Sequence, residues 1–251
     1  MDQLNPMSSR LSKLVVLVLV AGLASGCATT RQTTAKQPVD RFESWNRSVY
    51  SFNEALDRAV AKPVATAYVA VTPKPMRSGL ANFLSNIVYP GVILQDALQL
   101  KPTRFVRDTG RLLVNTTVGI GGLFDPATKL GLETNNEDFG QTLGYWGVPS
   151  GPYLMLPILG PSTVRDTVGT VADHFTQPES HLNNKLLGWG LSGARLVDRR
   201  ASLLGTEAAL KRYIDPYAFI RNSYLQRREF LIYDGNPPEQ PFEEEPDDST
   251  P

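Results

Sequence analysis

Two groups of residues have part of the spacing of an enzyme site. His174 and His181 stand seven residues apart, whereas a zinc-binding histidine pair on one helix face stands four residues apart. Ser150 lies between Gly147 and Gly151, but the nucleophile of a G-x-S-x-G turn lies midway between its glycines. Neither group predicts catalysis or a metal site.

The glycine-rich stretch at residues 119–122 matches only the beginning of a dinucleotide-binding fingerprint. Phe124 stands where the third glycine of that fingerprint is required, and no strand pattern precedes the stretch. The sequence also contains no phosphate loop of the G-x-x-x-x-G-K-[ST] type. We therefore expect a protein that is not an enzyme and does not itself hydrolyse ATP.

Cys27 is the only cysteine, so the chain can form no internal disulfide. It follows a start that contains Arg10 and Lys13, an apolar run at residues 14–23, and small residues at 24–26. This order is typical of a secretory signal peptide, and the apolar run is shorter than the roughly 20 residues of a spanning helix. A plain membrane anchor and an ordinary cleavable signal are the alternatives.

The residues around Cys27 resemble the lipobox of bacterial lipoproteins, in which the cysteine is acylated and becomes the mature N-terminus. Leu23 stands four residues before the cysteine, one more than is usual, and Ala28 replaces the aspartate that commonly retains such proteins at the inner membrane. The resemblance therefore implies sorting to the outer membrane. Several acyl chains on Cys27 would hold the protein stably, and we expect no cofactor besides this lipid.

The charge balance does not favour nucleic acid as a partner. Removal of residues 1–26 leaves 23 basic and 24 acidic residues of the 25 of each in the full chain. A nucleic-acid-binding domain would need a basic patch or stripe. With 41% hydrophobic residues, the mature chain can bury one core of good size, and one domain is the default expectation.

Composition predicts four segments. Residues 1–26 form the signal peptide, residues 27–39 a lipidated polar tether, and residues 40–235 a helical domain. Residues 236–251 are acidic and proline-rich and have almost nothing to bury, so we expect a disordered tail.

Within residues 40–235 the apolar residues recur at steps of three and four, the pattern of amphipathic helices. Asp40 is the predicted N-cap of the first helix, Pro63 its end and Pro90 the end of the second, and Pro102 begins the third. We see no sustained alternation of a strand type. The predicted fold class is all-α, a single helical domain. The helical stripes occupy residues 42–60, 76–87, 105–116, 164–175, 182–189 and 217–231.

Two stretches break the helical pattern. Residues 117–124 are too rich in glycine for a stable helix. Residues 144–161 are strongly apolar but contain four glycines and four prolines. Two alternatives remain open for these Gly/Pro-rich apolar residues: they form a loop that lines the core, or they face lipid.

Several ordered blocks resemble the MlaA (VacJ) family of outer-membrane lipoproteins. The resemblance covers about residues 40–235, and Arg41 departs from it where the family usually has proline. The main blocks are ESWNRSVYSFN at 43–53, NTTVGIGGLFD at 115–125, EDFGQTLGYWGVPSGPYLMLP at 137–157 and DPY at 215–217.

The resemblance implies a ring-like helical domain, embedded in the plane of the inner leaflet of the outer membrane and lipid-anchored on the periplasmic side. It implies association with an outer-membrane porin trimer. Such a protein removes misplaced phospholipid from the outer leaflet and passes it to a periplasmic lipid-carrier protein, which maintains lipid asymmetry. The alternative is a structural lipoprotein that scaffolds porins or envelope complexes without moving lipid.

Such transport needs a polar path for the headgroup, because its charges lose water in hydrocarbon. The candidates for lining this path are polar residues of the second and third blocks, with capping and turn formation as their alternative role: Asn115, Thr116, Thr117, Gln141 and Thr142. The candidates for a moving gate are glycines, with tight packing as their alternative role: Gly144, Gly147 and Gly151. Candidate anchors at the membrane interface, with packing in the core as their alternative role, are Trp45, Tyr50, Trp146, Tyr153 and Trp189.

Overall fold

The computed structural model describes residues 40–178, 182–207 and 213–238. The predicted signal peptide, tether and acylated Cys27, together with residues 239–251 of the acidic tail, lie outside the described residues. Helices dominate, as predicted, and no described helix has both the length and the apolar character needed to cross a membrane. The elements are α2 (Glu43–Leu56), the π-helical turn η1 (Asp57–Ala61), α3 (Lys62–Val71), α4 (Lys74–Leu98), α5 (Pro102–Thr117), α6 (Pro126–Lys129), α7 (Phe139–Tyr145), β1 (Tyr153–Leu156), β2 (Gly160–Thr163), α8 (Val164–Thr176), α9 (Lys185–Ser202) and α11 (Pro216–Ile232).

Helix α2 continues through η1 into α3, so the prediction that Pro63 ends this helix is wrong. In η1 the N–H of Lys62 donates to the carbonyl of Asp57, five residues back. Pro63 then occupies the first turn of α3, a position where the missing N–H of a proline is tolerated. The π-helical turn thus lets the chain stay helical across a residue that normally breaks a helix.

The start of α2 also differs from the prediction, because the N-cap is Phe42 and not Asp40. Asp40 still accepts hydrogen bonds at this end of the helix. Its Oδ1 atom accepts from the N–H of Phe42 at 3.1 Å and from Nδ2 of Asn46 at 2.9 Å. The Asp40 carboxylate therefore accepts hydrogen bonds from the start of α2, although it lies two residues before the N-cap.

Helix α4 runs through Pro90, so the predicted stop at that residue is wrong as well. A proline in a helix interior costs about 3 kcal/mol. Helix α4 contacts α5, α7 and α9, and this packing on several sides outweighs that cost. Helix α5 begins at Pro102 as predicted, and residues 118–123 form turns, as their glycine content indicates.

Two further helices, α6 and α11, begin with an aspartate cap followed by proline. Asp125 Oδ1 accepts from the N–H of Thr128 at 3.2 Å, and Asp215 Oδ1 accepts from the N–H of Ala218 at 3.1 Å. These bonds satisfy N–H groups that a helix start leaves without a partner.

The apolar stretch at residues 144–161 contains an antiparallel hairpin, which the sequence pattern did not predict. Strands β1 and β2 pair from Tyr153 opposite Thr163 to Leu156 opposite Gly160. Each strand has four residues, which is too short for a sustained alternation to be recognised. Within β1, Tyr153 and Met155 are buried while their neighbours are partly exposed. Of the two alternatives for this stretch, lining of the core therefore applies to β1. Residues 158–159 at the tip of the hairpin are exposed and do not line the core.

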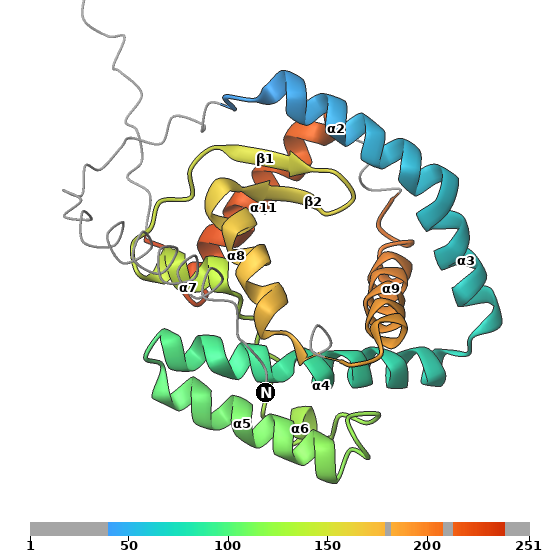
Figure 1. The fold of residues 1–251 in the computed structure, drawn as a ribbon, viewed down its shortest axis with the longest axis vertical. Coiled ribbons are helices and arrows are strands. Elements are labelled where there is room, and N and C mark those ends of the chain that lie inside the picture. Colours follow the sequence, from blue (N-terminus) through green and yellow to red (C-terminus); the bar gives the residue numbers. More distant parts are fainter. Residues whose placement is uncertain (1–39, 179–181, 208–212, 239–251) are drawn as a thin grey trace, which may run out of the picture. The chain divides into compact units, whose positions relative to one another are not determined.

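The elements close into a circuit in which each contacts the next (Figure 1). From α2 it passes to β1, β2, α8, α7, α4, α9 and α3, and returns through η1 to α2. Helix α5 packs on α4, and α6 packs on α5. This closed circuit agrees with the ring-like helical domain that the family resemblance implies.

A small apolar core lies where the hairpin meets α2 and α11. It consists of Val49, Tyr153, Met155 and Tyr217. The ring of Tyr217 meets that of Tyr153 edge-on, with 6.3 Å between centroids. Aromatic edge contacts of this kind add to the stabilisation that burial gives.

Candidate functional site

Helix α8 carries its apolar side chains on the exposed face. Val168 is 53% exposed and Phe175 is 70% exposed. On the other face Arg165 and Asp166 are buried. A surface helix of a soluble protein has the opposite arrangement, so the polarity of α8 is inverted.

Helix α5 shows the same inversion, and α9 exposes large apolar side chains. The buried residues of α5 are polar and follow helical spacing: Asp108, Arg111 and Asn115. Helix α9 has no buried residue, and its Leu186 and Trp189 are strongly exposed. Exposed apolar side chains in such number mark a surface that contacts lipid or another protein.

The five predicted interfacial anchors divide into three groups, of which one is Tyr50 alone, partly buried against the apolar core. Trp45, Trp146 and Trp189 are exposed, and their role as anchors stays a prediction. Tyr153 is only 4% exposed, so its prediction as an anchor is wrong. Its ring packs in the core beside β2 and α11, because the alternation of β1 turns this residue inward.

Beneath these exposed apolar residues, α4 and α7 are joined by buried polar side chains. Gln99 Nε2 donates to Glu137 Oε2 at 2.8 Å and to Thr142 Oγ1 at 3.0 Å. The Thr142 hydroxyl in turn donates to Gln95 Oε1 at 2.8 Å. All four side chains are buried. Hydrogen bonds, and not apolar packing, therefore hold this part of the interior together.

A second polar group centres on Arg228 of α11. Its guanidinium donates to Asp138 at 2.5 and 2.9 Å and to Asp166 at 2.8 Å. Burial alone would raise the pKa of both carboxyls, but hydrogen bonds and the charge of Arg228 bring the pKa of each below its usual range. Tyr224 adds a hydrogen bond to Asp166 at 2.8 Å. Helix α11 is thereby tied to α7 and α8.

Two other interior carboxyls, those of Asp96 and Asp173, have a pKa above the usual value. Burial, followed by the hydrogen bond and charge of Asp108, raises the pKa of Asp96 to about 8. Asn135 Nδ2 bridges the two residues, at 3.4 Å from Asp96 Oδ1 and 3.0 Å from Asp108 Oδ2. Burial and the charge of Asp138 raise the pKa of Asp173 to about 6. Asp96 and Asp173 therefore hold a proton to higher pH than an exposed aspartate does.

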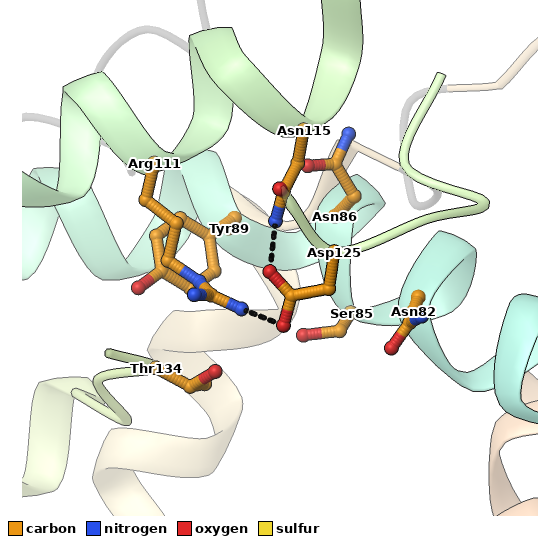
Figure 2. Close-up of a pocket in the computed structure, with 8 residues that line it drawn as sticks. All are labelled: Asn82, Ser85, Asn86, Tyr89, Arg111, Asn115, Asp125 and Thr134. Atoms are coloured by element: carbon orange, nitrogen blue, oxygen red, sulfur yellow. Dashed lines mark hydrogen bonds and ion pairs between the residues drawn. The ribbon is translucent and has the colours of Figure 1, made fainter. Parts of the chain in front are cut away.

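A polar cavity of about 60 Å³ lies between α4, the end of α5 and the start of α6 (Figure 2). Arg111 Nη2 donates to Asp125 Oδ2 at 2.7 Å, and Asn115 Nδ2 donates to Asp125 Oδ1 at 3.1 Å. Bonds from Thr128 and Arg111 outweigh the effect of burial and lower the pKa of Asp125 to about 2. The cavity has room for a few water molecules and not for a lipid headgroup. Its other lining residues are Asn82, Ser85, Asn86, Tyr89 and Thr134.

The first group of predicted path residues lies at this cavity and next to it. Besides Asp125, Asn115 binds the N–H of Ala127 through Oδ1 at 3.1 Å. Thr116 Oγ1 accepts from Asn86 Nδ2 at 3.0 Å, and Thr117 Oγ1 donates to a carbonyl of its own helix. These bonds match the alternative role of capping and turn formation.

The second group, Gln141 and Thr142, is fully buried in α7. No hydrogen bond among the described residues joins them to Asn115, Thr116 or Thr117. Gln141 Nε2 donates to Asp138 at 3.0 Å, and Thr142 belongs to the network with Gln99. The structure therefore places the five predicted path residues in two separate places.

The three predicted gate glycines differ in their surroundings. A Cβ on Gly144 would lie 2.8 Å from Ile232 Cδ1, which matches tight packing. Gly147 has φ +86° with nothing within 4 Å of a built Cβ, and Gly151 has φ +68°. The last two take backbone angles that other residues rarely adopt, as a bend in this segment requires.

Two asparagines of α2, to which the sequence analysis gave no role, hold the hairpin. Asn46 accepts from the N–H of Met155 at 2.7 Å and donates to the carbonyl of Tyr153 at 3.1 Å. Asn53 accepts from the N–H of Ile158 at 2.8 Å and donates to the carbonyl of Leu156 at 2.9 Å. Each side-chain amide thus pairs with the edge of β1 as a neighbouring strand would. Their seven-residue spacing, two helical turns, was the signal available in the sequence.

A larger cavity of about 600 Å³ lies where α2, η1, the end of α9 and the start of α11 meet. We name it the charged cavity after six of its lining residues: Glu54, Asp57, Arg58, Lys62, Arg200 and Glu207. Residues so far apart in the sequence gave no signal that they would meet. Among the described residues no group of three or more His, Cys, Asp or Glu is placed to hold a metal ion.

Comparison with known proteins decides the family. The sequence profile described as MlaA lipoprotein matches residues 38–231. This chain belongs to the MlaA lipoprotein family. It is 36% identical to the intermembrane phospholipid transport system lipoprotein MlaA of Escherichia coli K12 over 237 residues, which are 91% of this chain and 93% of the relative. The namesake from Haemophilus influenzae is 32% identical over 230 residues, 89% and 92% of the two chains.

The fold is confirmed by a solved structure described as "Structural basis for maintenance of bacterial outer membrane lipid asymmetry". It matches with a TM-score of 0.70 at 35% identity and covers 77% of this chain and 98% of that chain. The family that the sequence blocks indicated is therefore correct. It is a family of transport lipoproteins and not a known enzyme family.

Proposed function

We propose that this protein removes misplaced phospholipid from the outer leaflet of the outer membrane and passes it to a periplasmic lipid-carrier protein. The observation that carries the proposal is the inverted polarity of α5 and α8, together with the exposed apolar side chains of α9. A headgroup crosses some 30 Å of hydrocarbon only at a large cost in lost hydration. A protein with apolar side chains toward acyl chains and polar groups within gives the headgroup a path.

The proposal places the protein on the periplasmic side of the outer membrane, embedded in the plane of the inner leaflet and anchored by lipid on Cys27. The exposed apolar residues of α8 and α9, with Trp45, Trp146 and Trp189, support contact with lipid. Tryptophan is enriched at the level of the headgroups. The covalent lipid is the only attached group that this function needs, so we propose no other cofactor.

The proposed partners are phospholipid, an outer-membrane porin trimer and the periplasmic carrier. The names of the E. coli and H. influenzae relatives support phospholipid transport between membranes, and the family resemblance supports the porin and the carrier. The chain performs no catalysis in this scheme. Because it has no phosphate loop, another component must supply the energy.

Within this function we propose that residues 144–151 act as a gate beside the polar residues Gln141 and Thr142 of α7, and that Asn115, Thr116 and Thr117 form a separate polar stretch at the end of α5. The positive φ angles of Gly147 and Gly151 support a hinge. Replacement of Gly147 with alanine tests it, because the added Cβ meets nothing within 4 Å and the change acts only through the strain of a side chain at φ +86°. We expect normal protein levels and altered outer-leaflet phospholipid. If activity falls only in proportion to protein level, the segment is structural.

The function itself is tested on the purified, lipidated protein. We expect phospholipid to remain bound in a stoichiometric amount after extraction in detergent and washing, measured by mass spectrometry and phosphate analysis. A scaffolding lipoprotein that moves no lipid would lose it on washing. Absence of bound phospholipid in protein that is folded by circular dichroism would contradict lipid transport and favour scaffolding.

A further inference from the structure

The charged cavity is separate from the small polar cavity near Asn115 and is large enough for a small ligand. Its volume of about 600 Å³ lies within the range of roughly 300–1,000 Å³ in which proteins hold small molecules. Tyr50, Leu203 and Pro216 form an apolar part of its wall. The cavity therefore joins charged and apolar surface in one site.

The charges of the cavity are arranged as linked pairs. Arg200 donates to Asp57 Oδ2 at 2.8 Å and also binds Glu207. Glu207 in turn accepts from Lys62 Nζ at 2.5 Å, and these two bonds lower the pKa of Glu207, so it stays ionised. Arg58 and Glu54 form a separate pair one helical turn apart, at 3.1 Å. Three carboxylates thus face three cations, and the lining residues that the structure describes carry no net charge.

Several of these groups keep unused bonding capacity. Arg200 Nη1 is buried and has no hydrogen-bond partner among the described residues. The side chain of Lys62 is 43% exposed and that of Arg58 is 73% exposed, so each ammonium or guanidinium retains free donors. Glu54, at 55% exposure, retains free acceptor positions. Free donors and free acceptors therefore stand side by side in one cavity.

We propose that the charged cavity binds the headgroup of a zwitterionic phospholipid, a phosphodiester that carries a primary ammonium, in preference to an anionic one. The phosphodiester accepts from Lys62 and Arg58, and the ammonium donates to Glu54. The apolar wall receives the glycerol and the first carbons of the acyl chains. A site selective for anions would carry an excess of cations, and the described lining residues carry no such excess. The inference rests on the proposed function and adds headgroup selectivity to it.

The test uses the full-length lipidated protein in detergent and two short-chain lipids, dihexanoyl phosphatidylethanolamine and dihexanoyl phosphatidylglycerol, with affinities from isothermal titration calorimetry. Glu54→Gln gives the lining a net charge of about +1, and Arg58→Gln gives about −1, by loss of one charge each. Both side chains are exposed and pair only within α2 and η1, so both variants fold. Glu133→Gln changes the total charge equally at an exposed position outside the cavity.

We expect the wild type to bind phosphatidylethanolamine more tightly than phosphatidylglycerol. Glu54→Gln should shift the ratio of the two affinities toward phosphatidylglycerol by about three- to fivefold, the size of an exposed charge interaction. Arg58→Gln should shift it the opposite way, and Glu133→Gln should leave it unchanged. Glycerophosphoethanolamine, the same headgroup without acyl chains, should compete at millimolar concentration.

Equal affinities for the two lipids, or equal shifts in all three variants, would overturn the headgroup assignment while lipid binding itself stands. Failure of glycerophosphoethanolamine to compete would place recognition outside the charged cavity and also overturn it. Absence of binding for both lipids would instead contradict the proposed function on which the inference rests.

Discussion

Replacement of Asn46 with alanine removes the side-chain amide that fastens β1 to α2. Two backbone groups of β1 lose their partners, the N–H of Met155 and the carbonyl of Tyr153. Asn46, Tyr153 and Met155 are all buried, so water cannot replace the lost bonds. Each buried group left without a partner costs about 1–3 kcal/mol, and the pair costs about 2–6 kcal/mol.

Asn53→Ala is the matched control, because Asn53 makes the same two kinds of bond further along the hairpin. Asn53 is half-buried and the N–H that it binds belongs to the exposed Ile158. Water can replace these bonds, so the cost is that of two ordinary hydrogen bonds, about 1–3 kcal/mol in total. Asn46→Ala should therefore destabilise the protein about twice as much.

The assay combines thermal unfolding in detergent, followed by circular dichroism, with hydrogen exchange of individual backbone amides. In Asn46→Ala the Met155 amide should exchange much faster, while amides in α5 keep their protection. In Asn53→Ala the loss of protection should be confined to the hairpin tip. Equal destabilisation by both substitutions, or an unchanged exchange rate of the Met155 amide in Asn46→Ala, would refute the conclusion that Asn46 fastens β1 to α2.

Three further changes probe the packing, the interior carboxyls and the anchor. Gly169→Ala places a Cβ 2.4 Å from the backbone nitrogen of Gly140 and should lower the stability of the fold by about 1–3 kcal/mol. In the control Gly190→Ala the new Cβ meets nothing within 4 Å, and stability should rise by about 0.5–1 kcal/mol. Similar melting temperatures for the two variants would contradict this. Because burial raises the pKa of Asp96 from 3.8 to about 8, the stability of the fold should fall as pH rises through that interval. Asp96→Asn should flatten the plot of melting temperature against pH. An unchanged slope in this variant argues against a protonated Asp96 in the folded protein. Cys27→Ser should leave unlipidated precursor in the inner membrane, as mass spectrometry of cell fractions would reveal, and normal maturation of the variant would exclude the lipoprotein assignment.

Helical periodicity located the main helices, because steps of three and four are a local property of the sequence. It did not indicate which face is buried. The stripe of Val168, Val171 and Phe175 is regular, yet all three side chains are exposed. Periodicity reports that a helix has two faces, and only the surroundings decide which one meets water, lipid or protein.

The errors came from reading local signals without their tertiary context. Pro63 and Pro90 are helix breakers in isolation, but a π-helical turn accommodates the first, and packing of α4 outweighs the second. The hairpin escaped notice because its outer edge is paired by Asn46 and Asn53 and not by a third strand.

The candidate site was predicted less completely than the fold. Long sequence blocks identified the family, but they did not indicate that Gln141 and Thr142 are buried in α7. The pairing of Lys62 with Glu207 joins residues 145 apart in the chain, and no pattern in the sequence connects them. Such contacts arise only when the helical circuit closes.

The most direct measurement of the central claim is the amount of phospholipid in the outer leaflet of intact cells with and without the gene, read from its accessibility to added phospholipase. If the protein removes misplaced lipid, deletion raises outer-leaflet phospholipid, and expression of the full chain restores the original level. An unchanged outer leaflet after deletion, with porins and membrane integrity intact, would contradict the account.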